Sequence, residues 1–180
     1  MGNIMSVDQS LTCTGVCIFS ASGKLIHFEC VKTTNENTII ERISMISSRI
    51  VELYIKHKCV DIVFEQLSYG SMGDATRNLA GLLFTIETKL FEQLGLDELT
   101  KLPPTSVKKF AVGYGGSMTR KVTKKDMMDA LPEDTYSAFY DAGYLRSKGL
   151  ADLADAYFIG KLHLDNISKL AQVEILTDMK

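Results

Sequence analysis

The sequence predicts a mixed α/β domain with one central sheet, and three observations support this fold class. Short apolar or alternating runs at 4–8, 12–19 and 24–31 follow one another with turn residues between them. A helical repeat covers 36–57, and a fourth apolar run follows it at 60–65. The chain of 180 residues is long enough for one well-buried domain and short for two.

The first three runs predict consecutive antiparallel strands, because the segments that join them are short and polar. Gly15 interrupts the second strand and indicates a bulge or a close backbone approach beside Asp8. Isoleucines at three- and four-residue spacing predict an amphipathic helix over 36–57. If this helix is a crossover, the strand at 60–65 lies parallel to the first strand.

The rest of the chain is predicted to be mainly helical. We expect a helix at about 75–94 that ends at Gly95, and a short strand within 97–102. Thr105 or Ser106 is expected to cap a short helix, and Thr123 with Asp126 forms a capping box. The later predicted helices cover 135–147, 150–165 and 168–176. We assign 1–166 to one domain and 167–180 to a C-terminal tail, a short helix packed on that domain.

Composition narrows the class of function. The net charge of −2 argues against a protein that coats nucleic acid non-specifically, but a cationic stripe from Lys101 to Lys125 has seven basic residues and no acidic one. The four cysteines form no CxxC pair and no zinc-ligand spacing, so we expect small core residues in a reducing compartment. No apolar run approaches the roughly 18 residues of a membrane span. We expect a cytoplasmic protein without a membrane anchor.

Four carboxylates stand in otherwise apolar elements. Asp8 lies in the first strand, Glu65 ends the fourth, and Asp152 and Asp155 are one turn apart on a helix that is apolar almost all round. A buried ionised carboxylate costs several kcal/mol unless it is paired or binds a cation. No Lys or Arg lies within three residues of any of these carboxylates in sequence, so a shared divalent cation is the simplest explanation. Such a site predicts two-metal hydrolysis of a phosphodiester, with Mg²⁺ as the metal and Mn²⁺ as a substitute.

Four segments together resemble the RuvC family of Holliday junction resolvases, over about residues 3–165. They are Ile4–Gly15, Val63–Gln66, Pro104–Ser117 and Ala151–Ala156. The resemblance implies a ribonuclease-H-like fold, with three antiparallel strands, then parallel strands, and flanking helices. It also implies that Asp8, Glu65, Asp152 and Asp155 are catalytic metal ligands.

The same resemblance implies how DNA is bound. Lys108 takes the place of a catalytic lysine that faces a DNA phosphate, and Lys121 that of a second basic residue, with Arg120 and Lys124 as alternatives in register. An aromatic residue that wedges into the junction is expected at 68, where this chain has Ser68 followed by Tyr69. Further expected DNA contacts are Arg77 and Lys109.

The leading hypothesis is a Mg²⁺-dependent endonuclease that resolves four-way junctions by paired symmetric nicks and leaves 5′-phosphate and 3′-hydroxyl ends. Two symmetric nicks require two sites, so we expect a homodimer to which the helix at 75–94 contributes, with no small-molecule cofactor. One alternative is a debranching nuclease for forks, flaps or replication intermediates, and another is a non-catalytic module that binds branched DNA. Asp8 with Thr14-Gly15 also resembles the phosphate-binding turn of actin-like ATPases, but those proteins need two such domains. The modest length and a pI of about 5.9 favour a divergent member of bacteriophage origin, acting in a bacterial host cell.

Overall fold

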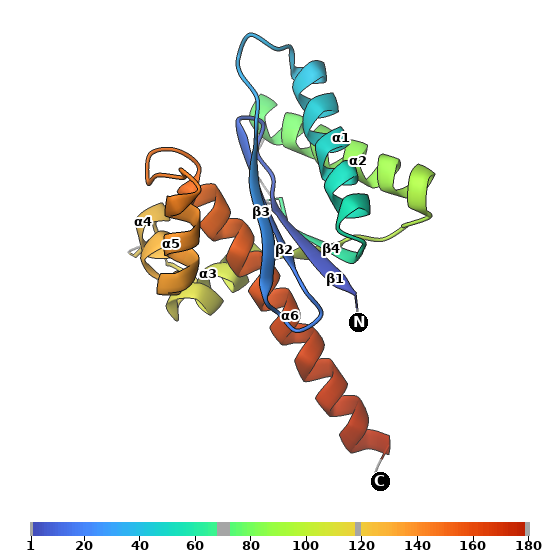
Figure 1. Cartoon of the computed structure of the whole chain (residues 1–180), viewed down its shortest axis with the longest axis vertical. Helices are drawn as coiled ribbons and strands as arrows, with labels where there is room; N and C mark the ends of the chain where they lie inside the picture. Colours follow the sequence, from blue (N-terminus) through green and yellow to red (C-terminus); the bar gives the residue numbers. More distant parts are fainter. Residues whose placement is uncertain (1, 68–72, 118–119, 179–180) are drawn as a thin grey trace.

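A five-stranded mixed sheet forms the centre of the molecule, with the strand order β3-β2-β1-β4-β5 (Figure 1). The structure is a computed structural model that describes residues 2–67, 73–117 and 120–178. The strands are β1 (Asn3–Asp8), β2 (Cys13–Phe19), β3 (Leu25–Lys32), β4 (Cys59–Glu65) and β5 (Thr100–Leu102). The helices are α1 (Ile39–Lys56), α2 (Asp74–Leu94), α3 (Pro104–Val112), α4 (Lys124–Asp129), α5 (Glu133–Asp141) and α6 (Leu150–Asp178).

The sheet has the predicted pairing. β1, β2 and β3 are antiparallel neighbours, and β4 lies parallel to β1 on its other side. This arrangement follows because α1 carries the chain from the β3 edge back across one face of the sheet. β5 then adds a second parallel pair beside β4. The parallel strands β1 and β4 therefore end at the same edge of the sheet.

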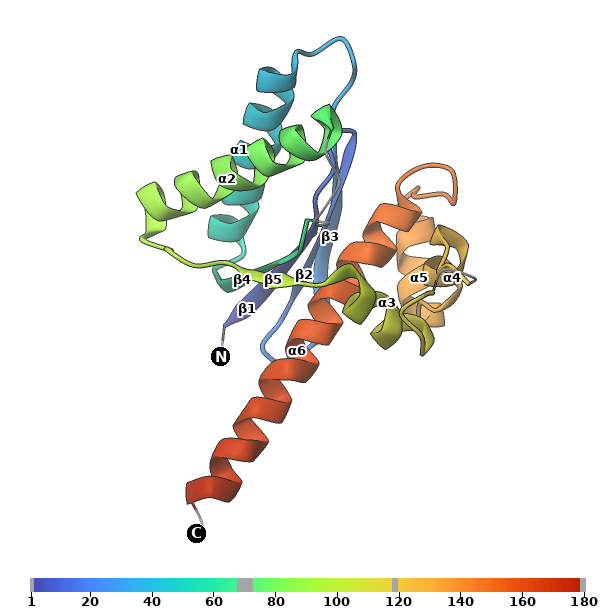
Figure 2. The same cartoon turned by 180° about the vertical axis from the view of Figure 1, so that it is seen from behind.

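The helices lie in two layers on opposite faces of the sheet (Figures 1 and 2). On one face α1 and α2 cover an apolar cluster that includes Met5, Val7 and Phe64. On the other face α6, with α3 to α5 beside it, covers a cluster that includes Cys17, Phe19 and Val63. Along each strand, residues of the two clusters alternate, because successive side chains of a strand point to opposite faces of the sheet.

Helix ends follow local capping chemistry. Thr38 forms a capping box with Glu41, so α1 begins at Ile39, later than 36. Gly95 ends α2 in the left-handed conformation, and the predicted Thr123–Asp126 capping box opens α4.

Two predicted helix boundaries are wrong. Neither Thr105 nor Ser106 caps α3, because the helix begins at Pro104 with Pro103 as its N-cap; a proline at the first helical position gives up no hydrogen bond. Helix α5 ends at Asp141 instead of 147, and Gly143 follows with φ +87°.

The predicted short terminal helix is also wrong, because α6 continues without a break from Leu150 to Asp178. No Gly or Pro occurs between 161 and 178, and the Asn and Ser residues there lower helix propensity only slightly. The end of α6 projects from the body of the molecule, and its residues 168–173 are exposed (Figure 1). Within the described ranges, no helix is both long enough and apolar enough to cross a membrane.

Candidate active site

Two strands direct carboxylates to the face of the sheet that α6 covers. On β1 the Ser6 hydroxyl donates to the Ala156 carbonyl of α6 at 2.7 Å, so Asp8, two residues later, points to the same face. On β4 Val63 packs in the α6-side cluster, and Glu65 shares its parity. The parallel pairing of β1 and β4 therefore brings Asp8 and Glu65 side by side at the ends of their strands.

The first two turns of α6 add Asp152 and Asp155 to this edge. The helix approaches the sheet closely at Gly15, where a Cβ atom would overlap the carbonyl group of Asp152. Gly15 is the antiparallel Cα partner of Asp8, so the helix start lies directly over the β1–β2 pair. This confirms the close backbone approach that the sequence predicts beside Asp8.

Asp8, Glu65, Asp152 and Asp155, here called the carboxylate cluster, interact strongly with one another. Burial raises the pKa of Asp8 well above its usual value, and Asp155, Glu65 and Asp152 raise it further. Burial and Asp155 raise the pKa of Glu65 to about 7. Burial also raises the pKa of Asp155 to about 6, against the influence of Lys124. Asp8, Glu65 and Asp155 therefore each hold a proton more tightly than an isolated carboxyl group does.

Two lysines from the cationic stripe reach this cluster. Lys124 at the start of α4 lies 3.2 Å from Asp152 Oδ1. Partial burial lowers the pKa of Lys124, but Asp152, Asp155 and Asp8 together raise it above its usual value. Lys108 of α3 lowers the pKa of Glu65 and of Asp155, so it lies near these two carboxylates. Of the three residues considered for the second basic position, Lys124 is the one that contacts a carboxylate.

A hollow of about 290 Å³ adjoins Lys108. Lys121 also lines it, so two cations of the stripe face one space. The guanidinium of Arg120 lies 4.0 Å from the centre of the Tyr114 ring, which is a cation–π contact. The backbone turns at Gly115, where a Cβ would come 2.8 Å from the Thr105 carbonyl oxygen. The lining residues are Thr105, Lys108, Gly115, Gly116, Ser117, Lys121 and Val122.

The remaining predicted DNA contacts are less closely tied to the cluster. Lys109 is exposed on α3 next to Lys108. Arg77 is 81% exposed on α2 and pairs with Asp74 at 3.2 Å. The predicted wedge position, Ser68 or Tyr69, lies outside the described residues.

Sequence reasoning missed two residues at this edge, Cys13 and Cys30. One ligand atom from each of these cysteines and one from Asp152 lie within 4.8 Å of one another. A hydrogen bond from Cys30 lowers the pKa of Cys13, and Asp152 partly opposes that shift. The cysteines belong to adjacent strands and come together only through the β2–β3 register, so linear spacing carries no signal for them.

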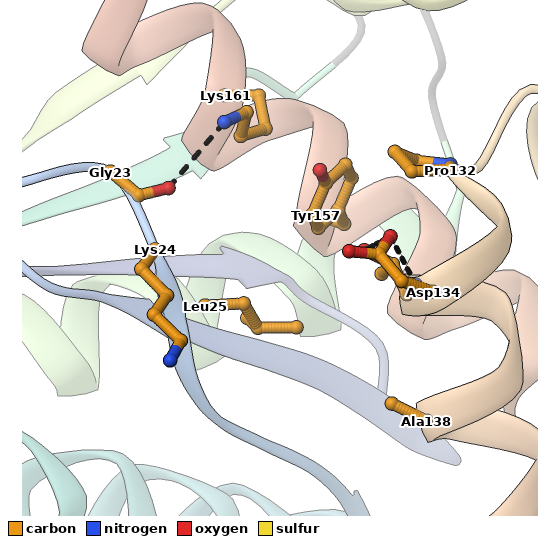
Figure 3. Close-up of a pocket in the computed structure, with 9 residues that line it drawn as sticks. Gly23, Lys24, Leu25, Pro132, Asp134, Ala138, Tyr157 and Lys161 are labelled. Carbon is orange, nitrogen blue, oxygen red and sulfur yellow. Dashed lines mark hydrogen bonds between the residues drawn. The ribbon is translucent and has the colours of Figure 1, made fainter.

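A second cavity lies away from the cluster, between the β2–β3 turn and helices α5 and α6 (Figure 3). It encloses about 320 Å³. Lys161 donates to the Gly23 carbonyl across one side of it at 3.4 Å, and Asp134 accepts from the Thr135 backbone N–H at 2.7 Å. No member of the carboxylate cluster lines this cavity, so we do not assign hydrolytic chemistry to it.

No protein-family model and no curated protein matches the sequence. Solved structures do match the fold. RuvC of Thermus thermophilus in complex with a Holliday junction substrate aligns with a TM-score of 0.62 at 20% identity, over 89% of this chain and 91% of that chain. The fowlpox virus Holliday junction resolvase aligns with a TM-score of 0.59 at 17% identity, over 92% of this chain and 99% of that chain. The yeast mitochondrial Holliday junction resolvase Ydc2 aligns with a TM-score of 0.59 at 16% identity, over 88% of this chain and 76% of that chain. The structural neighbours are thus RuvC and other Holliday junction resolvases, which confirms the predicted ribonuclease-H-like fold.

Proposed function

We propose that this chain, which has the fold of the Holliday junction resolvases, is a metal-dependent endonuclease that resolves four-way DNA junctions. The observation that carries the proposal is the convergence of Asp8, Glu65, Asp152 and Asp155 from three elements, with Lys108 and Lys124 beside them. The ends are expected to be a 5′-phosphate and a 3′-hydroxyl. Solved structures of similar fold, which are named as Holliday junction resolvases or hold a Holliday junction substrate, support this substrate class.

The donor set fits a divalent cation. All four groups offer carboxylate oxygens, which Mg²⁺ and Mn²⁺ prefer, and Asp8, Glu65 and Asp155 hold protons more tightly than isolated carboxylates do. Asp8, Glu65, Asp152 and Asp155 would hold the metal. When bound, a divalent cation supplies charge that offsets these carboxylates and activates water for attack on the phosphodiester.

The residues around the cluster position DNA for this reaction. Lys108 lies between the cluster and the hollow that Lys121 also lines, so it can contact a phosphate at the cleaved bond while Lys121 contacts a neighbouring one. Lys124 holds Asp152 in place through their 3.2 Å ion pair. The Gln9 side-chain amide donates to the Glu65 backbone carbonyl at 2.6 Å and fixes the end of β4 relative to β1.

Paired nicks imply two copies of the site, so we propose a homodimer. Helix α2 forms the outer layer of its face and exposes Phe84 at 71% and Phe91 at 58%. These residues line an apolar hollow of about 380 Å³ with Leu96 and Leu99. Apolar side chains exposed together in this way are typical of a protein interface.

The experiment that tests the function is cleavage of labelled four-way junction, fork, flap and linear duplex in Mg²⁺, Mn²⁺ or EDTA. Paired nicks on the junction that disappear in EDTA would support a resolvase. Preferential cutting of forks or flaps would support the same active site but indicate a debranching nuclease. Tight junction binding without cutting in either metal would leave a non-catalytic binding module and refute the proposed chemistry.

Asp8→Asn is the most direct test of the site. It removes a charge from the cluster with little change in shape, so we expect cleavage to be lost while junction affinity is unchanged or tighter, because a negative charge near phosphate is gone. Single-turnover cleavage and an equilibrium binding assay measure the two effects separately. Asp61→Asn is a matched control, because Asp61 of β4 pairs with His163 rather than with the cluster. Normal cleavage by Asp8→Asn would overturn the assignment.

A further inference from the structure

Three strands place a second group of metal-binding side chains next to the carboxylate cluster. Gly15 pairs with Asp8 on one side and with Cys30 on the other, so these three residues form one row across β1, β2 and β3. Cys13, two residues before Gly15, points to the same α6-side face as Gly15. Asp152 lies over Gly15 and thus stands between Asp8 and the two cysteines.

The two thiols and the Asp152 carboxylate are close enough to share one ion. One ligand atom from each residue lies within 4.8 Å of the other two. A tetrahedral zinc ion with Zn–S bonds of about 2.3 Å holds two sulfur ligands roughly 3.8 Å apart, so small side-chain movements would complete the site. Cys13 is half-buried, which leaves a path for the ion from solvent.

The backbone at the start of α6 is shaped around these sulfurs. The Cys30 thiol donates to the Gly149 carbonyl at 3.3 Å. A Cβ at Gly149 would come within 2.9 Å of the Cys30 sulfur, and the residue has φ +87°, so glycine is needed there. The fourth tetrahedral position is open to the Gly149 carbonyl oxygen or to water.

We propose that Cys13, Cys30 and Asp152 form a binding site for a thiophilic divalent cation, with Zn²⁺ as the expected ion, that lies next to the Mg²⁺ site and shares Asp152 with it. Two thiolates and one carboxylate match the ligands that zinc prefers, whereas Mg²⁺ prefers oxygen alone. Lys124 pairs with Asp152, and Lys32 lies near both cysteines, so the ion must displace or outweigh these cations.

This site has a consequence for the proposed nuclease, and that part rests on the proposed function. Asp152 interacts electrostatically with Asp8 and also with Cys13. A single carboxylate cannot serve both sites fully, so an ion bound to the cysteines draws Asp152 away from the carboxylate cluster. Zn²⁺ is therefore expected to inhibit cleavage in the presence of Mg²⁺.

Binding is tested first, without any DNA. Reduced full-length protein is titrated with Co²⁺ as a spectroscopic substitute for Zn²⁺, and the sulfur-to-cobalt charge-transfer absorption is followed. We expect one equivalent of Co²⁺ to produce this band and Zn²⁺ to abolish it. Cys13→Ser and Cys30→Ser should each weaken binding by more than the roughly 100-fold that loss of an outer-sphere partner costs. Thermal unfolding checks that each variant is folded.

Cys59→Ser is the matched control, because Cys59 packs in the cluster on the other face of the sheet. It should retain the cobalt band. Absence of the band in the wild-type protein, or its persistence in Cys13→Ser, would overturn the proposed site. If Cys30→Ser fails to fold, Cys13→Ser decides the outcome, because its side chain is only half-buried and differs by one atom.

Inhibition is then measured with junction DNA in Mg²⁺. Zn²⁺ should inhibit the wild-type protein and Cys59→Ser, whereas the cleavage rate of Cys13→Ser, compared with its own rate in Mg²⁺ alone, should resist Zn²⁺. Equal inhibition of Cys13→Ser would show that the ion acts elsewhere and would refute the shared use of Asp152. If no variant cleaves junctions in Mg²⁺ alone, the proposed function fails, while the cobalt result still decides whether the thiol site exists.

Discussion

At the scale of single residues, the raised pKa values of the carboxylate cluster connect metal binding to stability. Glu65, with a pKa of about 7, and Asp155, with a pKa of about 6, bind protons in the folded chain at a pH where the unfolded chain has released them. Through these two carboxyl groups the folded state binds more protons than the unfolded state above about pH 4, so their contribution to stability falls as pH rises.

We expect the contribution of these carboxyl groups to the free energy of unfolding of the metal-free protein to decrease as pH rises from about 4 through the pKa of Glu65. The rise of the Glu65 pKa from 4.5 to about 7 alone lowers the free energy of unfolding by roughly 3 kcal/mol once Glu65 is ionised. Urea unfolding in EDTA at several pH values measures this slope. Mg²⁺ should restore stability at pH 8, and the stability of Glu65→Gln should fall less with rising pH than that of the wild-type protein. Equal pH profiles for the two proteins would contradict the charge balance described here.

Lys108 and Lys109 allow a second test, because they are adjacent on α3 but only Lys108 interacts with the carboxylates. Lys108→Ala should lower the single-turnover cleavage rate by about 100- to 1000-fold, the cost of removing one charged group that stabilises the transition state. Its effect on ground-state binding should be smaller. Lys109→Ala should change affinity modestly and leave the cleavage rate of bound DNA unchanged. A Lys108→Ala effect confined to affinity would make Lys108 a positioning contact.

At the scale of elements, the site depends on how closely α6 approaches the sheet. Its packing requires the absence of side chains at two places, Gly15 on β2 and Gly160 on the helix, where an added Cβ would come 2.7 Å from the Ser6 hydroxyl oxygen. The helix is anchored between them by the hydrogen bond from Ser6 to Ala156. Both aspartates of α6 precede this anchor by at most four residues, so a shift of the helix moves them relative to Asp8.

Gly15→Ala should therefore displace the start of α6. We expect destabilisation of about 1–3 kcal/mol or more from overpacking, and a loss of activity near 100-fold for a displacement of about 1 Å. Gly81→Ala is the matched control in α2, where the added Cβ would meet Ile43 at an ordinary 3.6 Å. It should stabilise the helix by about 0.5–1 kcal/mol and leave cleavage unchanged. Urea unfolding measures the stability of each variant, and single-turnover cleavage measures its activity. A fully active Gly15→Ala would show that the close approach of α6 to β2 is not needed.

At the scale of the whole molecule, the two faces of the sheet have different tasks. The α6 face carries the cluster and the basic residues from α3 and α4, whereas α1 and α2 on the other face bury an apolar core. The outer surface of α2 adds exposed aromatic side chains to that second face. A dimer formed through α2 would keep both active sites accessible to DNA.

We expect the wild-type protein to sediment as a dimer and Phe84→Asp to sediment as a monomer. A charge at this 71% exposed position would be costly to bury in an interface but harmless on a free surface. Ile40→Asp on α1, at a position 75% exposed, is the control and should remain dimeric. The monomer should still bind one arm of a junction but lose paired nicking. A wild-type monomer at micromolar concentration would refute the proposed assembly.

Sequence alone determined the local features of this protein. The period of two in the strands, the helical repeat of 36–57, the Thr123–Asp126 capping box and the Gly95 stop each depend on neighbouring residues, and the structure confirms them with small shifts in boundaries. It also identified Asp8, Glu65, Asp152 and Asp155 as out of place in apolar elements, which is a local property of each segment.

Tertiary structure decided what depends on contacts between distant segments. Sequence left three residues open for the second basic position, and the packing of α4 against α6 brings one of them, Lys124, to 3.2 Å from Asp152. The proximity of Cys13 and Cys30 to Asp152 arises from strand register and from a helix that begins more than a hundred residues later. The spacing of residues along the chain does not predict such contacts, because they form only when the sheet and α6 pack together.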